Sequence, residues 1–506
     1  MLPLLDFMGS VPLLPGFLDS VVAVVDLPAP ILAVGVPLLF IIAYVLVMFE
    51  ETLHMRKSKP VMLAAGLIWL LIAIFPPLAD HDAADHPTPT SGEASRIPYG
   101  QVKGLPQTEE LLHAREHVGD ALRHYLLEYA ELFLFLLAAM TYVNAMEERK
   151  IFDVLRDKLI RSGLGYRGLF WATGAIAFFL SPVLDNMTTA LVVCSALVAL
   201  GRDSPRFVTL GAINLVVAAN AGGAFSPFGD ITTLLVWQAG HLPFTDFFAL
   251  FGPSVVNAVV PAACMHFAVP KGRPSSPEVE SHFRRGALGV MVLFAATIGT
   301  TVMMHSFLHL PPVLGMMTGL AYLKLYSYYL TITSPNGEQS NPDIVGRDAE
   351  DVSPFDSFKL VARAEWDTLL FFYGVTLCVG GLGYIGYLTL GADYFYGTWG
   401  HTLANIAIGI LSAVVDNIPV MMAVLEMNPA GMTEGQWLLV TLTAGVGGSL
   451  LSIGSAAGVA LMGQARGIYT FGTHLAWTPA IFLGYVASIA VHFWWNSHLF
   501  TTVYHP

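Results

Sequence analysis

An acidic and an amide residue stand side by side at two distant places in the sequence, each time four residues after a serine. The two copies read Ser181-Pro-Val-Leu-Asp185-Asn186 and Ser412-Ala-Val-Val-Asp416-Asn417. Carboxylate, amide and hydroxyl oxygens are the ligands that small hard cations prefer. A carboxylate can also take up a proton, so a proton and a cation would compete for the same group. The pattern therefore predicts a site that either ion can occupy.

A Gly-Gly pair lies downstream of each copy, and a further glycine with a polar neighbour follows it six residues later. The first break runs from Gly222 to Asp230 and the second from Gly447 to Ser455. Helix ends at such breaks provide carbonyls and a local potential suited to ions. The candidate cation ligands are Ser181, Asp185, Asn186, Thr188, Ser226, Asp230, Thr232, Thr233, Ser412, Asp416, Asn417, Ser449, Ser452 and Ser455. The structural alternatives are helix capping for Asp-Asn and close helix packing for Gly-Gly.

The composition shows what kind of chain must position these residues. It has 506 residues, 55% hydrophobic and only 12% charged, about half the charged fraction of a soluble protein. We expect an all-α polytopic membrane protein of about 10–12 spans in contact with the lipid bilayer. The net charge of −13 leaves no basic face for nucleic acid. The three cysteines all lie in apolar stretches and indicate neither a disulfide framework nor a metal site.

The segment 168–200, which carries the first copy, has basic residues on both sides. Because Lys and Arg favour the cytoplasm, both ends should face inside, so we expect a re-entrant hairpin with its tip near the membrane centre. The corresponding segment 402–426 lies in a stretch without Lys or Arg, and both its ends should face outside. Inverted repeats with paired broken helices, here 206–240 and 436–465, are typical of secondary transporters with a site at the repeat interface.

These patterns predict a division of the chain into five parts. An apolar surface segment covers 1–30, and N-terminal spans with an outer loop, forming a scaffold, cover 31–118. The first repeat covers 119–270 and the second 365–506. Connecting spans and a cytoplasmic loop cover 271–364. An acidic residue opens a Leu/Phe-rich span upstream of each hairpin, Glu131 in one case and Asp367 in the other. Each could serve proton transfer or gating, or could simply lie in the membrane interface.

The chain resembles the NhaD-type sodium/proton antiporters of the ion transporter superfamily. The resemblance rests on Ser181-Pro-Val-Leu-Asp-Asn-Met-Thr-Thr-Ala, Val414-Val-Asp-Asn-Ile-Pro-Val, Asn220-Ala-Gly-Gly-Ala-Phe-Ser-Pro-Phe-Gly-Asp230-Ile-Thr-Thr233 and Glu365-Trp-Asp367-Thr-Leu-Leu-Phe-Phe372. It runs from roughly 120 to 495 and adds Asn220 to the candidate ligands.

This resemblance implies exchange of Na⁺ or Li⁺ for H⁺ in a bacterial inner membrane, with activity rising at alkaline pH. It also implies a homodimer in which a transport domain, holding both hairpins and both broken helices, moves against a scaffold in an elevator fashion. Proton binding would then fall to Asp185, Asp416 and Asp230, with Glu131 and Asp367 as further candidates. No cofactor is expected, because Na⁺ or Li⁺ is the transported substrate.

Two other functions fit parts of the pattern. The first is a sodium-coupled organic-anion symporter or an oxyanion exporter on the same fold. It would need a basic or amide-rich pocket, yet no Lys or Arg occurs in 207–270 or 364–465. The second is an intramembrane aspartyl protease using Asp185 and Asp416. The Gly-x-Gly-Asp sequence that would support it flanks neither residue, and the inverted repeat would have no role there.

Overall fold

The computed structural model describes residues 30–48, 53, 55–77, 108–274, 281–333 and 357–501. Residues 1–29 of the predicted surface segment lie outside these ranges, as do 78–107 of the outer loop and 334–356 of the connecting loop. Every regular element of the described part is helical.

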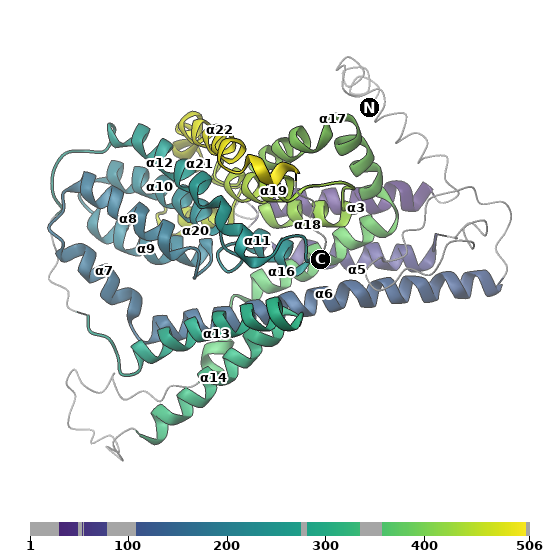
Figure 1. The fold of residues 1–506 in the computed structure, drawn as a ribbon, viewed down its shortest axis with the longest axis horizontal. Coiled ribbons are helices and arrows are strands. Elements are labelled where there is room, and N and C mark those ends of the chain that lie inside the picture. Colours follow the sequence, from purple (N-terminus) through teal and green to yellow (C-terminus); the bar gives the residue numbers. More distant parts are fainter. Residues whose placement is uncertain are drawn as a thin grey trace. The chain divides into compact units, whose positions relative to one another are not determined.

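The helices follow one another along the chain as Figure 1 labels them. The first ten are α3 (Pro30–Met48), α5 (Ser58–Ile74), α6 (Thr108–Glu148), α7 (Ile151–Arg161), α8 (Tyr166–Leu180), α9 (Asn186–Leu200), α10 (Pro205–Gly223), α11 (Ile231–Gln238), η2 (Phe244–Leu250) and α12 (Phe251–His266). The others are α13 (Ala287–Leu308), α14 (Pro312–Ile332), α15 (Ser357–Ala362), α16 (Trp366–Tyr384), α17 (Tyr387–Leu411), α18 (Asn417–Met427), α19 (Glu434–Gly447), α20 (Ala456–Gln464), α21 (Phe471–Leu475), α22 (Thr478–Trp495) and η4 (Ser497–Thr501).

Five helical segments of the described part are long and apolar enough to cross a membrane. They are His113–Glu148, Phe244–His266, Ala287–Leu308, Trp366–Tyr384 and Thr478–Trp495. Shorter apolar helices accompany them, among them α9 and the segment 417–427 that forms α18. The predicted class of all-helical, multi-pass membrane protein is confirmed, while the count of about 10–12 spans stays a prediction.

The chain divides into two compact units. The first comprises Met1–Ala130, Trp366–Ala404 and Met422–Ala430, and the second comprises Glu131–Glu365, Asn405–Met421 and Gly431–Pro506. In the first unit α5 packs against α3 and α16. Glycines of α16 make this packing close, because a Cβ on Gly374 would lie 2.7 Å from the carbonyl carbon of Val61. Small residues at helix contacts are typical of membrane proteins, since they let two backbones approach.

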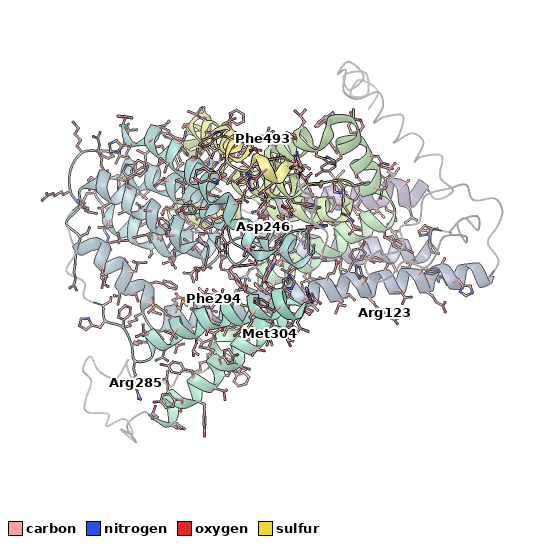
Figure 2. All side chains as sticks on the ribbon, viewed as in Figure 1. Arg123, Asp246, Arg285, Phe294, Met304 and Phe493 are labelled. Carbon is pink, nitrogen blue, oxygen red and sulfur yellow. The ribbon has the colours of Figure 1, made fainter. Side chains whose placement is uncertain are left out.

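In the second unit α13 packs along α14, again through glycine. A Cβ on Gly319 would overlap the side chain of Thr297, and Tyr142 of α6 donates a hydrogen bond of 2.6 Å to the carbonyl of Gly319. Figure 2 shows Phe294 and Met304 along α13, with Arg285 just before the helix begins. Phe294 is buried, whereas Met304 is half-buried.

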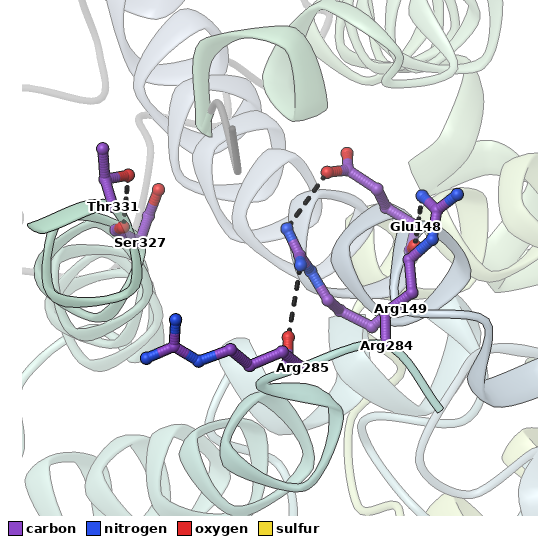
Figure 3. Close-up of polar contacts among 6 residues, drawn as sticks. All are labelled: Glu148, Arg149, Arg284, Arg285, Ser327 and Thr331. Atoms are coloured by element: carbon purple, nitrogen blue, oxygen red, sulfur yellow. Dashed lines mark hydrogen bonds and ion pairs between the residues drawn. The ribbon is translucent and has the colours of Figure 1, made fainter. Parts of the chain in front are cut away.

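Basic residues meet where α6 ends and α13 begins (Figure 3). Arg149 donates to the carbonyl of Arg285 over 3.2 Å and pairs with Glu148 over 3.3 Å. Arg284 donates to the carbonyl of Glu148 over 3.3 Å. These residues come from two segments rich in Lys and Arg, which favour the cytoplasmic side of a membrane. Their contact brings the two segments together at one end of the second unit, as a common side of the membrane requires.

Four helical segments are interrupted at the places that the sequence predicts. Residues 181–185 separate α8 from α9, and 412–416 separate α17 from α18. Residues 224–230 separate α10 from α11, and 448–455 separate α19 from α20. A left-handed Gly400, with φ of 72°, also breaks the helical conformation inside α17, so the arm that leads to Ser412 starts there.

The two groups of interrupted helices share one packing scheme. The hydroxyl of Ser181 donates to the carbonyl of Ala219 over 2.6 Å, and that of Ser412 donates to the carbonyl of Ala444 over 2.8 Å. A Cβ on Gly222 would lie 2.2 Å from the carbonyl oxygen of Phe178, and one on Gly447 would lie 2.0 Å from that of Gly409. The glycine pairs therefore let one helix backbone lie directly on another.

Gly222→Ala is expected to destabilise the protein, because the added methyl group cannot occupy a position 2.2 Å from a backbone oxygen. Overpacking of this kind costs about 1–3 kcal/mol. Thermal melting of the purified protein measures the effect. The matched control is Gly463→Ala in α20, where a Cβ would have no neighbour within 4 Å and a small gain from better helix propensity is expected. Equal melting temperatures for the two variants would contradict the packing argument.

Candidate cation site

Asp230, the residue that ends the first break, lies at the centre of a polar cluster in the second unit. It is the N-cap of α11 and accepts a hydrogen bond of 3.0 Å from the backbone N–H of Thr232. Asn186 donates to its Oδ2 over 3.2 Å, and Asn417 donates to both carboxylate oxygens over 3.2 and 3.1 Å. The side chain is 3% exposed. The amides of both Asp-Asn pairs thus converge on one buried carboxylate.

Asn220 of α10 extends this cluster toward the second break. Its Oδ1 accepts a hydrogen bond of 3.1 Å from Asn186. Its Nδ2 donates to the hydroxyls of Ser449 and Ser455 over 2.8 and 3.0 Å. Ser455 in turn is the N-cap of α20, the place that Asp230 takes before α11. Residues from both interrupted groups therefore form one continuous hydrogen-bonded network.

The network leaves the charge of Asp230 without a positive partner. Its side-chain donors are neutral amides, and no ion pair reaches it from the residues that the structure describes. Asp416 adds a second negative charge close enough to repel that of Asp230. A buried carboxylate without a counter-charge is costly, by several kcal/mol in real proteins. A proton or a cation that neutralises this charge would therefore stabilise the site.

A further oxygen and unfilled space lie beside this carboxylate. The hydroxyl of Thr232 is buried and lies within reach of it. A Cβ added to Gly445 would lie 3.5 Å from Oδ2 of Asp230 and 3.7 Å from Oγ1 of Thr232. A carbon atom would fit there at contact distance, so glycine leaves open a position next to both oxygens. Carboxylate and hydroxyl oxygens suit a small hard cation.

Asp185 has a different environment from its neighbour Asn186. It is the N-cap of α9, and its carboxylate accepts hydrogen bonds from the backbone N–H and the hydroxyl of Thr188 over 2.8 and 2.7 Å. Its φ of 43° is one that L-residues rarely adopt, and such backbone strain concentrates at functional sites. Glu365 adds an unfavourable negative charge nearby. The sequence analysis names Glu365 in a motif of the family resemblance but assigns it no role.

Several other predicted ligands form structural hydrogen bonds. Ser226 donates to the carbonyl of Pro182 over 2.8 Å, and Thr233 donates to the carbonyls of Ser226 and Asp230 over 2.8 and 2.6 Å. Ser452 donates to the sulfur of Met462. These bonds fix the backbone of the turn and of the breaks around the cluster. The hydroxyls of Ser181 and Ser412 also form structural hydrogen bonds, to carbonyls of α10 and α19.

Glu131 and Asp367 are the other two residues predicted for proton transfer or gating. Both are half-buried, and no hydrogen bond or ion pair of the described residues joins either of them to the cluster. Asp367 belongs to the first unit, where the hydroxyl of Ser58 donates to it over 2.5 Å. Glu131 is the first residue of the second unit. A role for either in proton transfer stays a prediction.

A histidine that sequence reasoning missed supports the second break. His474 in α21 is fully buried, with Nε2 2.8 Å from the carbonyl oxygen of Ser449 and Nδ1 2.7 Å from the hydroxyl of Tyr469. The carbonyl can only accept, so Nε2–H donates to it and the tyrosine donates to Nδ1. His474 thereby fixes the backbone at Ser449, whose hydroxyl holds Asn220.

His474→Ala is expected to leave the Ser449 carbonyl and the Tyr469 hydroxyl buried without their partners, each at a cost of about 1–3 kcal/mol. We expect a lower melting temperature together with weaker Na⁺ binding, both read from thermal melting with and without NaCl. Tyr469→Phe removes only the outer bond and should lower stability with less effect on the ion. His282→Ala, at an exposed position, is the control. Unchanged sodium dependence in His474→Ala would contradict the supporting role.

A buried polar network between interrupted helices of a multi-pass membrane protein defines the class of secondary transporters. The sequence model described as "Citrate transporter" matches residues 44–445. The chain is 53% identical to "Na(+)/H(+) antiporter NhaD" of Alkalimonas amylolytica, over 91% of this chain and 90% of that protein. It is 52% identical to the Vibrio cholerae protein of the same name over 92% of each chain. The chain therefore belongs to the NhaD group of the citrate transporter family.

More distant relatives carry a similar name. "Sodium/proton antiporter 1" of Arabidopsis thaliana is 31% identical over 91% of this chain and 72% of that protein. The family is one of transporters, so the chain is not an enzyme. The aspartyl-protease alternative is thereby excluded.

Proposed function

We propose that this protein exports Na⁺ across the membrane in exchange for H⁺, with Asp230 as the group for which the two ions compete. One observation carries the proposal: a carboxylate that is 3% exposed is held by neutral amides and by no basic residue. Such a group must gain a proton or a cation to be stable, and it cannot hold both. Release of one ion then requires arrival of the other, which is the condition for exchange.

The other predicted residues complete this proposal. Two further carboxylates add negative charge on the two sides of the network and would raise its affinity for cations. Asp416 repels Asp230, and Asp185 lies beside Asn186. The buried hydroxyl of Thr232 offers a neutral oxygen ligand beside the carboxylate. Glu131 and Asp367 are proposed as relay or gating groups outside the cluster. Li⁺ is proposed as a second substrate, because it is a small hard cation that suits the same oxygen ligands.

We further propose that 119–270 and 365–506 are inverted repeats whose hairpins re-enter the membrane from opposite sides. The paired serine bonds and the paired glycine contacts support this, because unrelated segments would not share them. Charge supports the inversion, since Arg202 and Arg206 follow the first hairpin whereas the second lies in a stretch without Lys or Arg. Elevator movement, a homodimer and a bacterial inner membrane are proposed from the family resemblance.

Organic-anion transport is the second candidate, because the family model that matches the chain is named for citrate. The acids in the cluster argue against it. An anion would need Lys, Arg or a set of free amide donors, whereas 207–270 and 364–465 contain neither Lys nor Arg. Asn186 and Asn417 already donate to Asp230 and are not free to bind a carboxylate substrate.

Fluorescence dequenching in everted membrane vesicles distinguishes the two functions. Vesicles acidified by respiration should lose their pH gradient when NaCl or LiCl is added, and should keep it when potassium citrate is added. Vesicles without the protein are the control. A response to citrate, or none to sodium at any pH between 6 and 9.5, would exclude the proposed exchange.

A further inference from the structure

A groove in the second unit lies outside the polar cluster. Its walls are α8 and α12, its floor is α10, and it has a cavity volume of about 140 Å³. Trp171, Ala175 and Phe179 form one wall, and Val259 and Ala262 form part of the other. Phe179 is 65% exposed and Val259 is 44% exposed, so the groove opens on an apolar surface of a membrane protein. Such a surface is suited to contact with the hydrocarbon of the bilayer.

The groove has one polar end. Trp171 Nε1–H donates to Nδ1 of His266 over 3.1 Å and so closes the space between α8 and α12. Tryptophan in such a place is typical of the membrane interface. From Trp171 to Phe179 the groove follows about eight residues of α8, or roughly 12 Å at 1.5 Å per residue. This length matches part of an extended acyl chain.

Basic residues gather immediately beyond that end. The backbone N–H of Tyr166 bonds the carbonyl of Gly272 over 3.0 Å, which joins the start of α8 to the segment after α12. Arg167 donates to the carbonyl of Val269 over 3.3 Å. Lys271 and Arg273 are exposed, and none of these three basic residues forms an ion pair with a described carboxylate. A positively charged patch therefore adjoins one end of the apolar groove. The positions of Lys and Arg in the sequence predict that this end faces the cytoplasm.

We propose that this groove binds an anionic phospholipid, with the acyl chain between α8 and α12 and the phosphate against Lys271, Arg273 and Arg167. Basic pockets between helices on the cytoplasmic side bind the head groups of such lipids. The apolar groove matches the acyl chain of the lipid, and the adjoining basic residues match its phosphate. A free phosphate would leave the groove unused, and a neutral lipid would leave the basic residues unused. The site is independent of the proposed ion exchange.

Native mass spectrometry of the purified full chain tests this with dioleoylphosphatidylglycerol and dioleoylphosphatidylcholine. We expect the wild type to retain the anionic lipid about tenfold better. Lys271→Gln with Arg273→Gln should remove this preference, and Ala175→Trp should reduce retention of both lipids by filling the groove. Lys324→Gln with Lys359→Gln, an exposed basic pair on α14 and α15, is the matched control and should behave as the wild type does.

Any of four results would overturn the proposal. The first is an undiminished preference in the Lys271/Arg273 variant, and the second is its loss in the Lys324/Lys359 control. The third is a dimer that Ala175→Trp dissociates in the absence of lipid, which would make this face a contact between two copies. Glycerol phosphate is the probe for the head group alone, and full competition by it would show that the groove takes no part. Sodium-dependent exchange should be unchanged in every variant.

Discussion

Asp230→Asn is expected to abolish sodium-dependent proton exchange and, at the same time, to make the protein more stable in sodium-free alkaline buffer. The carboxylate is buried against neutral donors, so its charge destabilises the empty protein and attracts the cation. Removal of an interaction worth about 3–5 kcal/mol lowers affinity by about 100- to 4,000-fold. Vesicle dequenching measures the exchange, and thermal melting measures the stability.

The control for this variant is Asp393→Asn, which changes the same side chain at an exposed position of α17. It should exchange ions and melt as the wild type does. A saturating concentration of Na⁺, about 100 times its dissociation constant, should stabilise the wild type and Asp393→Asn by about 2.7 kcal/mol. Asp230→Asn should show no such gain. Sodium-dependent exchange in Asp230→Asn at the wild-type rate would remove this residue from the mechanism.

Asn417→Ala is expected to weaken Na⁺ binding by about 10- to 100-fold, because hydrogen bonds to a charged group contribute about 1.5–3 kcal/mol. The amide contacts both oxygens of Asp230 at 3.1 and 3.2 Å and stabilises only its ionised form. Without it the proton is held more tightly relative to the cation, so the pH of half-maximal exchange should rise. Dequenching measured across pH 6–9.5 at several NaCl concentrations gives both quantities.

Asn144→Ala is the matched control for that experiment. Asn144 also donates a hydrogen bond from its amide, over 3.0 Å to the carbonyl of Leu360, but it belongs to α6 and lies outside the network. Loss of this hydrogen bond should lower the stability of the protein and leave the pH dependence of exchange unchanged. Asn186→Ala should act like Asn417→Ala with a smaller effect, because it makes a single contact with the carboxylate. An unchanged pH profile in Asn417→Ala would contradict the assigned role.

The positions of the helix interruptions could be predicted from the sequence, because glycine pairs, prolines and adjacent polar residues are rare inside apolar segments. The interruptions at 181–185 and 412–416 and the two Gly-Gly breaks fall where those residues stand. The sequence also marks most of the residues that form the network, since oxygen-bearing side chains are rare in such segments. Charge and hydropathy patterns suffice for these inferences because the bilayer constrains the backbone so strongly.

What could not be predicted is which member of each Asp-Asn pair faces the centre. The left-handed conformation of Asp185 turns its carboxylate back to Thr188 and leaves Asn186 to reach Asp230, and no spacing rule reveals that. Gly445 carries no polar group, so no ligand pattern in the sequence indicates it. Alignment of the two breaks gives Gly445 the position in the second break that Asn220 has in the first. His474 belongs to a five-residue helix outside both repeated motifs.

The central claim is that Na⁺ and H⁺ exclude each other at Asp230. Calorimetric titration of Na⁺ into the purified protein, repeated in buffers with different heats of ionisation, counts the protons released for each ion bound. We predict that proton release per sodium ion is largest at low pH, where the free carboxylate is protonated, and declines as the pH rises, and that Asp230→Asn gives no binding heat. Sodium binding without proton release at every pH, or with the same release in Asp230→Asn, would contradict the account.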